Sequence, residues 1–130
     1  MTPHWLWVST AVAEAAHGEQ LAEHGGGTGL RDAGALESAM MRPQNLAEYG
    51  DPDVAALAAA YAFGVARNHP FVDGNKRTAA VVSETFLAIN GYALSASDAE
   101  LVVAFVALAA GELSETELAD WFRTRLTAAD

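Results

Sequence analysis

The residue types that can do chemistry are concentrated in one short segment, His69–Thr78, which reads HPFVDGNKRT. It holds an imidazole, a carboxylate, an amide, a lysine and an arginine around a single glycine. We expect this segment, called the motif segment below, to form a turn and then the first turn of a helix. A helix N-terminus presents unpaired N–H groups and the positive end of the helix dipole. The motif segment is therefore a candidate anion site.

The phosphate-binding chemistry would come from the second half of the motif segment. Gly74 lets the backbone approach a ligand closely, so the amides of Gly74, Asn75 and Lys76 can line an anion pocket. Lys76 and Arg77 add full charges, and a guanidinium can hold a phosphate through two parallel hydrogen bonds. Asp73 would repel that phosphate unless a hard cation such as Mg²⁺ bridges the two groups.

His69 completes the set, because an imidazole can accept a proton near neutral pH. Phe71 is expected to point into the core. A base, a metal-binding carboxylate and a phosphate clamp can together transfer a phosphate-containing group to a hydroxyl. The alternative is a purely structural corner between two helices, in which the histidine only forms hydrogen bonds. The complete set at this spacing favours function.

The composition restricts the class of protein. A chain of 130 residues, 52% of them hydrophobic, can form one domain, residues 1–130, with a real core. The net charge of −10, from 17 acidic and 7 basic residues, argues against nucleic-acid binding, because it repels phosphate backbones. No stretch suits a membrane span, and the N-terminus lacks the basic region of a signal peptide. The absence of cysteine favours a cytoplasmic protein.

Two further groupings of polar residues are candidate sites by their residue types. Three of the seven basic residues, Arg67, Lys76 and Arg77, fall within eleven positions. In an acidic chain this cluster is a candidate anion site, although surface salt bridges are an equal alternative. His17 and His24 share a helix face, but their spacing of seven residues is too long for both to chelate one zinc ion.

Apolar periodicity and capping residues predict an all-α domain, a compact single-domain bundle of about six helices. The expected helices cover residues 7–24, 34–41, 53–68, 74 or 75 to 89, 97 or 98 to 110, and 114–126. Asp53 is the expected N-cap of the third, and Ser114 with Glu117 forms a capping box for the last. The glycine-rich sequence HGGGTG, at residues 24–29, must end the first helix, and Pro43 must stop the second. Residues 44–52 are expected to form a loop or an irregular hairpin, and no strand is predicted.

The motif segment resembles the signature of the Fic/Doc (Fido) family, His-Pro-Phe-x-Asp/Glu-Gly-Asn-x-Arg, and every fixed position from His69 to Arg77 matches. Outside it, the stretches QLAEHGG, GLRDAGALESAMMRP and NGY resemble the short death-on-curing (Doc) toxin branch. The likeness covers nearly the whole chain. It implies a helical-bundle fold, in agreement with the periodicity.

The resemblance implies a role for each matching position. His69 would be the base that activates the target hydroxyl, and Asp73 would hold Mg²⁺. Gly74 and Asn75 would shape the anion hole, and Arg77 would bind the phosphates of the nucleotide.

Lys76 bears on the reaction that the resemblance implies. AMP-transferring members usually have glycine there, whereas the Doc branch has Asn-Lys-Arg, as this chain does. We therefore expect a toxin that transfers phosphate from ATP, with Mg²⁺, to a Ser/Thr hydroxyl of a translation factor such as elongation factor Tu. The His-Pro-Phe and Asp-Gly-Asn portions are closer to AMP-transferring members, so AMP transfer to a protein hydroxyl is the alternative. An inactive Fic-fold interaction module is the third.

The resemblance also implies how such a toxin is controlled. The family has a self-inhibiting helix with a Ser/Thr-x-x-x-Glu-Gly/Asn pattern, and the nearest match, TAVAEA at Thr10–Ala15, ends in alanine. Inhibition should therefore come from a separate antitoxin protein in trans. Residues 44–52 occupy the place of the family's target-docking flap, or form an ordinary connecting loop.

Overall fold

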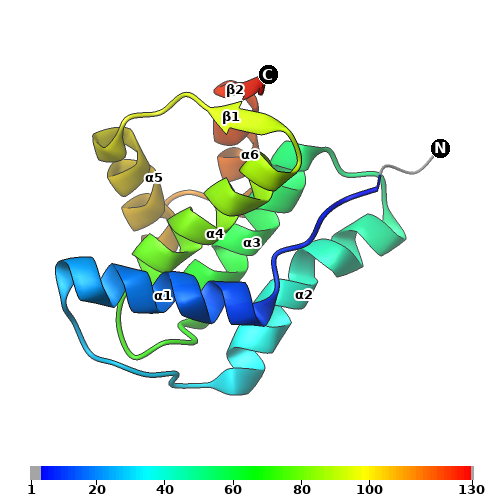
Figure 1. The fold of residues 1–130 in the computed structure, drawn as a ribbon. Helices are drawn as coiled ribbons and strands as arrows, with labels where there is room; N and C mark the ends of the chain where they lie inside the picture. The colour runs from blue at the N-terminus through cyan, green and yellow to red at the C-terminus, as the bar shows by residue number, and fades with distance from the viewer. Residues whose placement is uncertain (1–3, 130) are drawn as a thin grey trace.

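The structure, a computed structural model, describes residues 4–129, in which six helices and a small two-stranded sheet form one bundle (Figure 1). The helices are α1 Thr10–His24, α2 Ala33–Tyr49, α3 Val54–Asn68, α4 Asn75–Ile89, α5 Asp98–Ala110 and α6 Glu115–Arg123. The strands are β1 Tyr92–Leu94 and β2 Leu126–Ala128, which pair antiparallel. The predicted all-α fold of about six helices is confirmed. Among residues 4–129, no helix is both long and apolar enough to span a bilayer.

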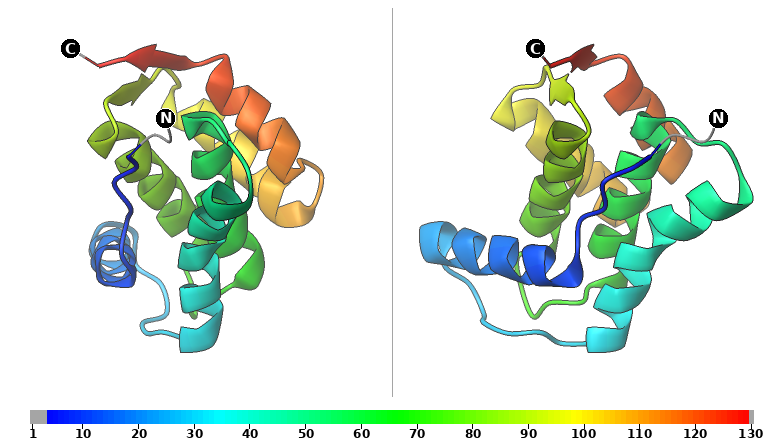
Figure 2. Two further views of the ribbon diagram at one scale, coloured as in Figure 1. Left: turned by 90° about the vertical axis from the view of Figure 1, so that its right-hand side faces the viewer. Right: turned by 45° about the vertical axis from the view of Figure 1, so that its right-hand side comes forward.

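Helix α3 is the centre of the bundle, with α2, α4 and α6 packed around it (Figure 2). From Val54 to Ala66 its sequence has no charged side chain, and nearly all of these residues are buried. Small residues allow close approach of the helices, because a Cβ on Gly64 would lie only 2.9 Å from the Cα of Ala39 in α2. Asp53 accepts a hydrogen bond from the Ala56 N–H at 2.9 Å, which confirms it as the N-cap of α3.

The prediction for the second helix was wrong. Helix α2 continues through Pro43 to Tyr49, so residues 44–49 are helical instead of forming a loop or hairpin. A proline inside a helix removes one backbone donor and crowds the carbonyl four residues earlier, here that of Ala39. Pro43 is buried and Ala39 lies directly against Gly64 of α3, so packing against the central helix outweighs the local cost of the proline.

The ends of the helical region also differ from the prediction. The first helix begins at Thr10, because the Ser9 side chain caps it by accepting a hydrogen bond from the Val12 N–H at 3.2 Å. The last helix ends at Arg123, and the chain then forms β2, in which Leu126 lies opposite Leu94 of β1. Three-residue strands are too short to show an alternating pattern, which is why the sequence did not reveal them.

The segment before α1 lies across the core, where hydrogen bonds to the Asn90 side chain and to the Tyr61 hydroxyl hold it. The rings of Trp5 and Trp7 pack on Phe86, with centroids 6.1 and 5.8 Å from it. Between the two tryptophans and the start of α1, the Val8 N–H donates a hydrogen bond to the Tyr61 hydroxyl of α3 at 2.9 Å. The same hydroxyl lies 3.4 Å from the Val8 carbonyl. Burial raises the pKa of Tyr61 to about 12, so the hydroxyl keeps its proton throughout the physiological range.

Replacing Tyr61 with phenylalanine should lower the free energy of unfolding by about 1–3 kcal/mol, because the buried Val8 N–H loses its partner. Urea denaturation followed by circular dichroism measures the change. The matched control is Tyr49→Phe, since the Tyr49 side chain is 84% exposed and its hydroxyl should contribute less than about 0.5 kcal/mol. Equal midpoints for the two variants would contradict the role of the Tyr61 hydroxyl.

Candidate active site

The motif segment forms the connection between α3 and α4, as predicted. His69 is the C-cap of α3, and Gly74 is the N-cap of α4 with a φ of 77°, in the left-handed region. Glycine suits this position because a side chain would strain the backbone there. Phe71 has only 2% of its surface exposed and anchors the turn in the core, also as predicted. The turn therefore brings the end of one buried helix next to the start of another.

Asn75 holds this turn from the inside. Its Oδ1 accepts a hydrogen bond from the Phe71 N–H at 3.0 Å, and its Nδ2 donates to the Phe71 carbonyl at 3.0 Å. The residue is buried, with 6% of its surface exposed. Its side chain is therefore committed to the turn, and any contribution to an anion hole would come from its backbone N–H.

His69 is presented to solvent in an unusual backbone conformation. Within residues 4–129 it is the one non-glycine residue with a positive φ, at 49°. Its Nδ1 lies 3.4 Å from Asn75 Nδ2, at the outer limit of a hydrogen bond. A donated Asn75 N–H would favour the tautomer with its proton on Nε2, whereas proton acceptance at Nε2 needs the other tautomer. At this distance the contact only weakly constrains the ring.

Asp73 points back onto the backbone around it. Its Oδ1 accepts a hydrogen bond from the Gly74 N–H at 2.8 Å, and its Oδ2 lies 3.4 Å from the Gly27 N. The amide of Gly74, one of the three expected to line an anion pocket, is thus occupied by this carboxylate. The glycine-rich segment after α1 fits closely here, because a Cβ on Gly26 would lie 2.8 Å from Asp73 Oδ2. These glycines therefore do more than end the first helix.

The N-terminus of α4 is left open for a ligand. No side chain caps it within the described residues, and its first backbone hydrogen bond runs from Thr78 N to the Gly74 carbonyl at 3.0 Å. The cationic side chains of Lys76 and Arg77 are exposed at this end, and within residues 4–129 neither forms an ion pair.

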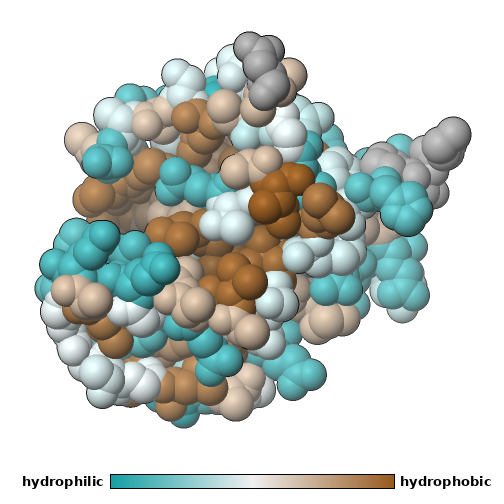
Figure 3. Space-filling model, viewed as in Figure 1, coloured by the Kyte–Doolittle hydropathy of each residue, from teal (hydrophilic) through white to brown (hydrophobic). Residues whose placement is uncertain are grey.

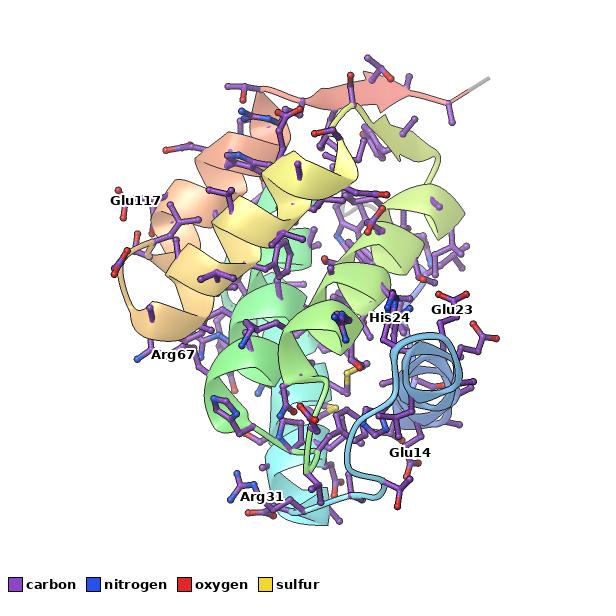
Figure 4. The ribbon with its side chains drawn as sticks, turned by 90° about the vertical axis from the view of Figure 1, so that its left-hand side faces the viewer. Glu14, Glu23, His24, Arg31, Arg67 and Glu117 are labelled. Carbon is purple, nitrogen blue, oxygen red and sulfur yellow. The ribbon has the colours of Figure 1, made fainter. Side chains whose placement is uncertain are left out.

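Arg67 does not join the cationic cluster that its sequence position suggests. Its guanidinium lies over the ring of Phe63, 5.4 Å from the centroid, and reaches toward Gly111. Figure 4 shows Arg67 beside the turn between α5 and α6, away from Arg31 at the lower end of the bundle. The candidate anion site is therefore reduced to Lys76 and Arg77.

A cavity of about 530 Å³, called the site cavity below, lies in front of the motif segment. All six predicted site residues line it: His69, Asp73, Gly74, Asn75, Lys76 and Arg77. The opposite wall comes from α5, through Leu101, Val102, Phe105 and Val106, and Figure 3 shows apolar side chains along the hollow beneath this helix. This wall was not predicted from the sequence. The sequence does contain an indication of it, because LVVAFV, at residues 101–106, is apolar on more sides than a helix with one buried face requires.

The sequence also did not predict a supporting role for His17, whose spacing from His24 raised only the question of a zinc site. Its Nε2 donates a hydrogen bond to the Asp73 carbonyl at 2.7 Å, and its ring stacks on Phe71 with centroids 3.9 Å apart. The residue is buried, with 5% of its surface exposed. Helix α1 therefore supports the turn from behind. No sequence signal indicates this contact, because it joins positions 56 residues apart.

A larger groove of about 860 Å³ lies between α2, α3 and α6 and reaches Asn68, the residue before His69. Both of its arginines are paired, Arg42 with Glu115 and Arg123 with Asp53. The Arg123 guanidinium also holds the pKa of Asp53 below its ordinary value. Because its cations are neutralised, this groove suits an anion less well than the site cavity does.

Known proteins are similar in sequence to this chain. A family model described as "Fic/DOC family" matches residues 7–87, which include the motif segment. The protein "Toxin Doc" of Mycolicibacterium smegmatis is 47% identical over 74 residues, which cover 55% of this chain and 57% of that protein. The "Protein kinase doc" of Escherichia phage P1 is 36% identical over 110 residues, which cover 84% of this chain and 86% of that protein.

Replacing Asn75 with alanine should lower the free energy of unfolding by about 1–3 kcal/mol, because the backbone N–H and carbonyl of Phe71 lose their partners. The neighbouring Lys76→Ala, at an exposed position, is the matched control and should change stability by less than about 0.5 kcal/mol. Chemical denaturation of both variants measures the difference. An Asn75→Ala protein as stable as the parent would show that the turn does not depend on this side chain.

Proposed function

The chain belongs to the Fic/DOC family, and on that premise we propose that it is a Doc-type toxin that phosphorylates a protein hydroxyl with ATP. One observation carries the proposal: a base, a carboxylate and an open, cationic helix N-terminus line the same cavity. This is the equipment of a phosphoryl transferase, in which positioning and charge stabilisation provide most of the catalysis. The relatives named "Toxin Doc" and "Protein kinase doc" support the toxin and the kinase parts of the proposal.

The two walls of the site cavity suit the two halves of a nucleotide. The N–H groups at the start of α4, with Lys76 and Arg77, attract the phosphates, because the helix dipole and both side chains carry positive charge there. Val102 and Val106 of α5 are 62% and 49% exposed on the opposite side. An aromatic base can cover these apolar side chains, so we assign the α5 wall to the adenine end of ATP.

His69 is the proposed base. In the reaction the target hydroxyl oxygen bonds to the γ-phosphorus of ATP, the bond between that phosphorus and the β–γ bridging oxygen breaks, and ADP leaves. The hydroxyl proton passes to His69, whose exposed ring lines the cavity beside the start of α4.

Asp73 suits a Mg²⁺ ion that arrives with the nucleotide. It is the one acidic side chain among the described residues that line the site cavity. Within residues 4–129, no three His, Cys, Asp or Glu side chains gather to hold a metal by themselves. Magnesium prefers six oxygen ligands, so phosphates and water would supply the others. When bound, the ion would neutralise charge on the phosphates.

Lys76 favours transfer of phosphate over transfer of AMP. A glycine at this position would leave room for the α-phosphate of a nucleotide in the anion pocket. The lysine fills part of that room and brings a charge that can hold a terminal phosphate in the reversed orientation. Arg77 remains the bidentate phosphate ligand in either orientation.

We further propose that the target is a translation factor such as elongation factor Tu, and that a separate antitoxin inhibits the toxin in the cytoplasm. The internal candidate for inhibition, the TAVAEA segment, supports this view by its position. Its Glu14 lines a different groove, together with Thr10 and Glu37, and does not line the site cavity.

The kinase proposal predicts that the purified protein transfers label to a protein in cell lysate from γ-labelled ATP and not from α-labelled ATP. His69→Ala should lower the rate by about 10²–10⁴-fold while the protein stays folded, because the ring is exposed at the end of α3. Gel autoradiography with both labels measures the transfer. Transfer of the α-label alone would contradict the kinase proposal and support an AMP transferase. Transfer of neither label would support the inactive interaction module.

The proposed role of Asp73 predicts that Mg²⁺ and ATP bind cooperatively. Titration calorimetry should show little Mg²⁺ binding to the free protein, because a single carboxylate makes a weak magnesium site. ATP should bind more tightly with Mg²⁺ present, and Asp73→Asn should remove most of that gain. Tight binding of Mg²⁺ without any nucleotide would contradict this role.

A further inference from the structure

Three consecutive carbonyls at the candidate base accept hydrogen bonds from one residue, Arg31. Its Nε donates to the His69 carbonyl at 2.7 Å, and its Nη2 donates to the Asn68 carbonyl at 3.0 Å. Its backbone N–H donates to the Pro70 carbonyl at 2.7 Å. Figure 4 shows Arg31 at the lower end of the bundle, near the start of α2. Arg31 lies outside the motif segment and has no part in the proposed function above.

These bonds satisfy backbone carbonyls that the end of α3 leaves without partners. The last carbonyls of an α-helix have no partners within the helix, and a cation is favourable near them. Here the helix ends with His69 in the left-handed region, which a non-glycine residue adopts only when its surroundings compensate. The Arg31 guanidinium provides two donors in a fixed planar fork, which matches two adjacent carbonyls.

Arg31 is itself fixed in place by the chain around it. Its segment runs antiparallel to residues 70–72, with a bridge between Leu30 and Phe71 and a hydrogen bond from Val72 N to the Gly29 carbonyl at 3.1 Å. The next residue, Asp32, caps α2 by accepting from the Ala35 N–H at 3.0 Å. The guanidinium therefore reaches the end of α3 from a rigid base.

We propose that Arg31 is a positioning residue, which holds His69 in its left-handed conformation and so directs the imidazole into the site cavity. The inference rests on the proposed function, because it assumes that the His69 ring takes part in the reaction. Arg31 does not line the site cavity, whereas Lys76 and Arg77 do. Its effect on the reaction therefore passes through His69 and not through the phosphates.

The test compares Arg31→Met with the parent protein in the label-transfer assay. Methionine keeps part of the aliphatic stem and removes all the donors. We expect kcat to fall by up to about 10²-fold, the loss that a displacement of about 1 Å can cause, with the KM for ATP unchanged. Arg31→Lys should restore little, since one ammonium cannot reproduce the planar fork, whereas guanidinium added to Arg31→Met should restore part of the rate.

Arg67→Met is the matched control, because Arg67 is an exposed arginine at the same end of α3. Its guanidinium contacts the Phe63 ring and not the turn. This variant should leave kcat unchanged. A second comparison uses the His69→Ala background, in which Arg31→Met should cause no further loss of the residual rate. An equal loss in both backgrounds would overturn the proposal, because Arg31 would then act on the nucleotide or the target directly.

A readout independent of activity separates this inference from the proposed function. The ring C–H resonances of His69, assigned by their loss in His69→Ala, should shift or broaden in Arg31→Met and stay in place in Arg67→Met. Unchanged His69 resonances in Arg31→Met would overturn the positioning role even if the wild-type protein is an active kinase. If the wild-type protein transfers neither label while the resonances move, the proposed function fails and the structural link between Arg31 and His69 stands.

Discussion

The paired hydrogen bonds between the Asn75 side chain and the backbone of Phe71 are the constraint on which the site depends. They close a turn whose two ends belong to different helices, and they do so in the dry interior, where an unpaired polar group is costly. Because the first residue of α4 supplies the clamp, the helix cannot start elsewhere without opening the turn. The open N-terminus of α4, with Lys76 and Arg77 beside it, follows from that start.

The turn is supported from outside by two segments that carry none of the motif. Helix α1 places His17 behind it, stacked on Phe71 and bonded to the Asp73 carbonyl. The following glycine-rich segment passes close to the Asp73 carboxylate and continues to Arg31, which holds the carbonyls at the end of α3. The groups of the motif segment are therefore positioned by contacts with α1 and the segment after it, in addition to their own helices.

The basic residues of this acidic chain are divided between structure and site. Three of the seven have carboxylate partners: Arg42, Arg123 and Arg125. Arg31 binds backbone carbonyls, and Arg67 lies over the ring of Phe63. Lys76 and Arg77 are the two left without a carboxylate, a carbonyl or an aromatic ring as a partner within residues 4–129, and both line the site cavity. In a chain of net charge −10, positive potential is thereby concentrated where a phosphate would bind.

The sequence by itself determined the local features of this protein. Asp53 and Ser114 cap helices where predicted, and the glycine and polar residues of the motif segment indicated both the turn and the residues that line its cavity. These signals act over three or four residues, so they are readable without the fold. Only the tertiary structure decided that α2 continues through Pro43, that α5 faces the motif, and that His17 and Arg31 support it. Each of these depends on contacts between residues distant in sequence. The energy of such contacts can outweigh the local helix propensity, as at Pro43, and local propensity gives no information about which distant residues meet.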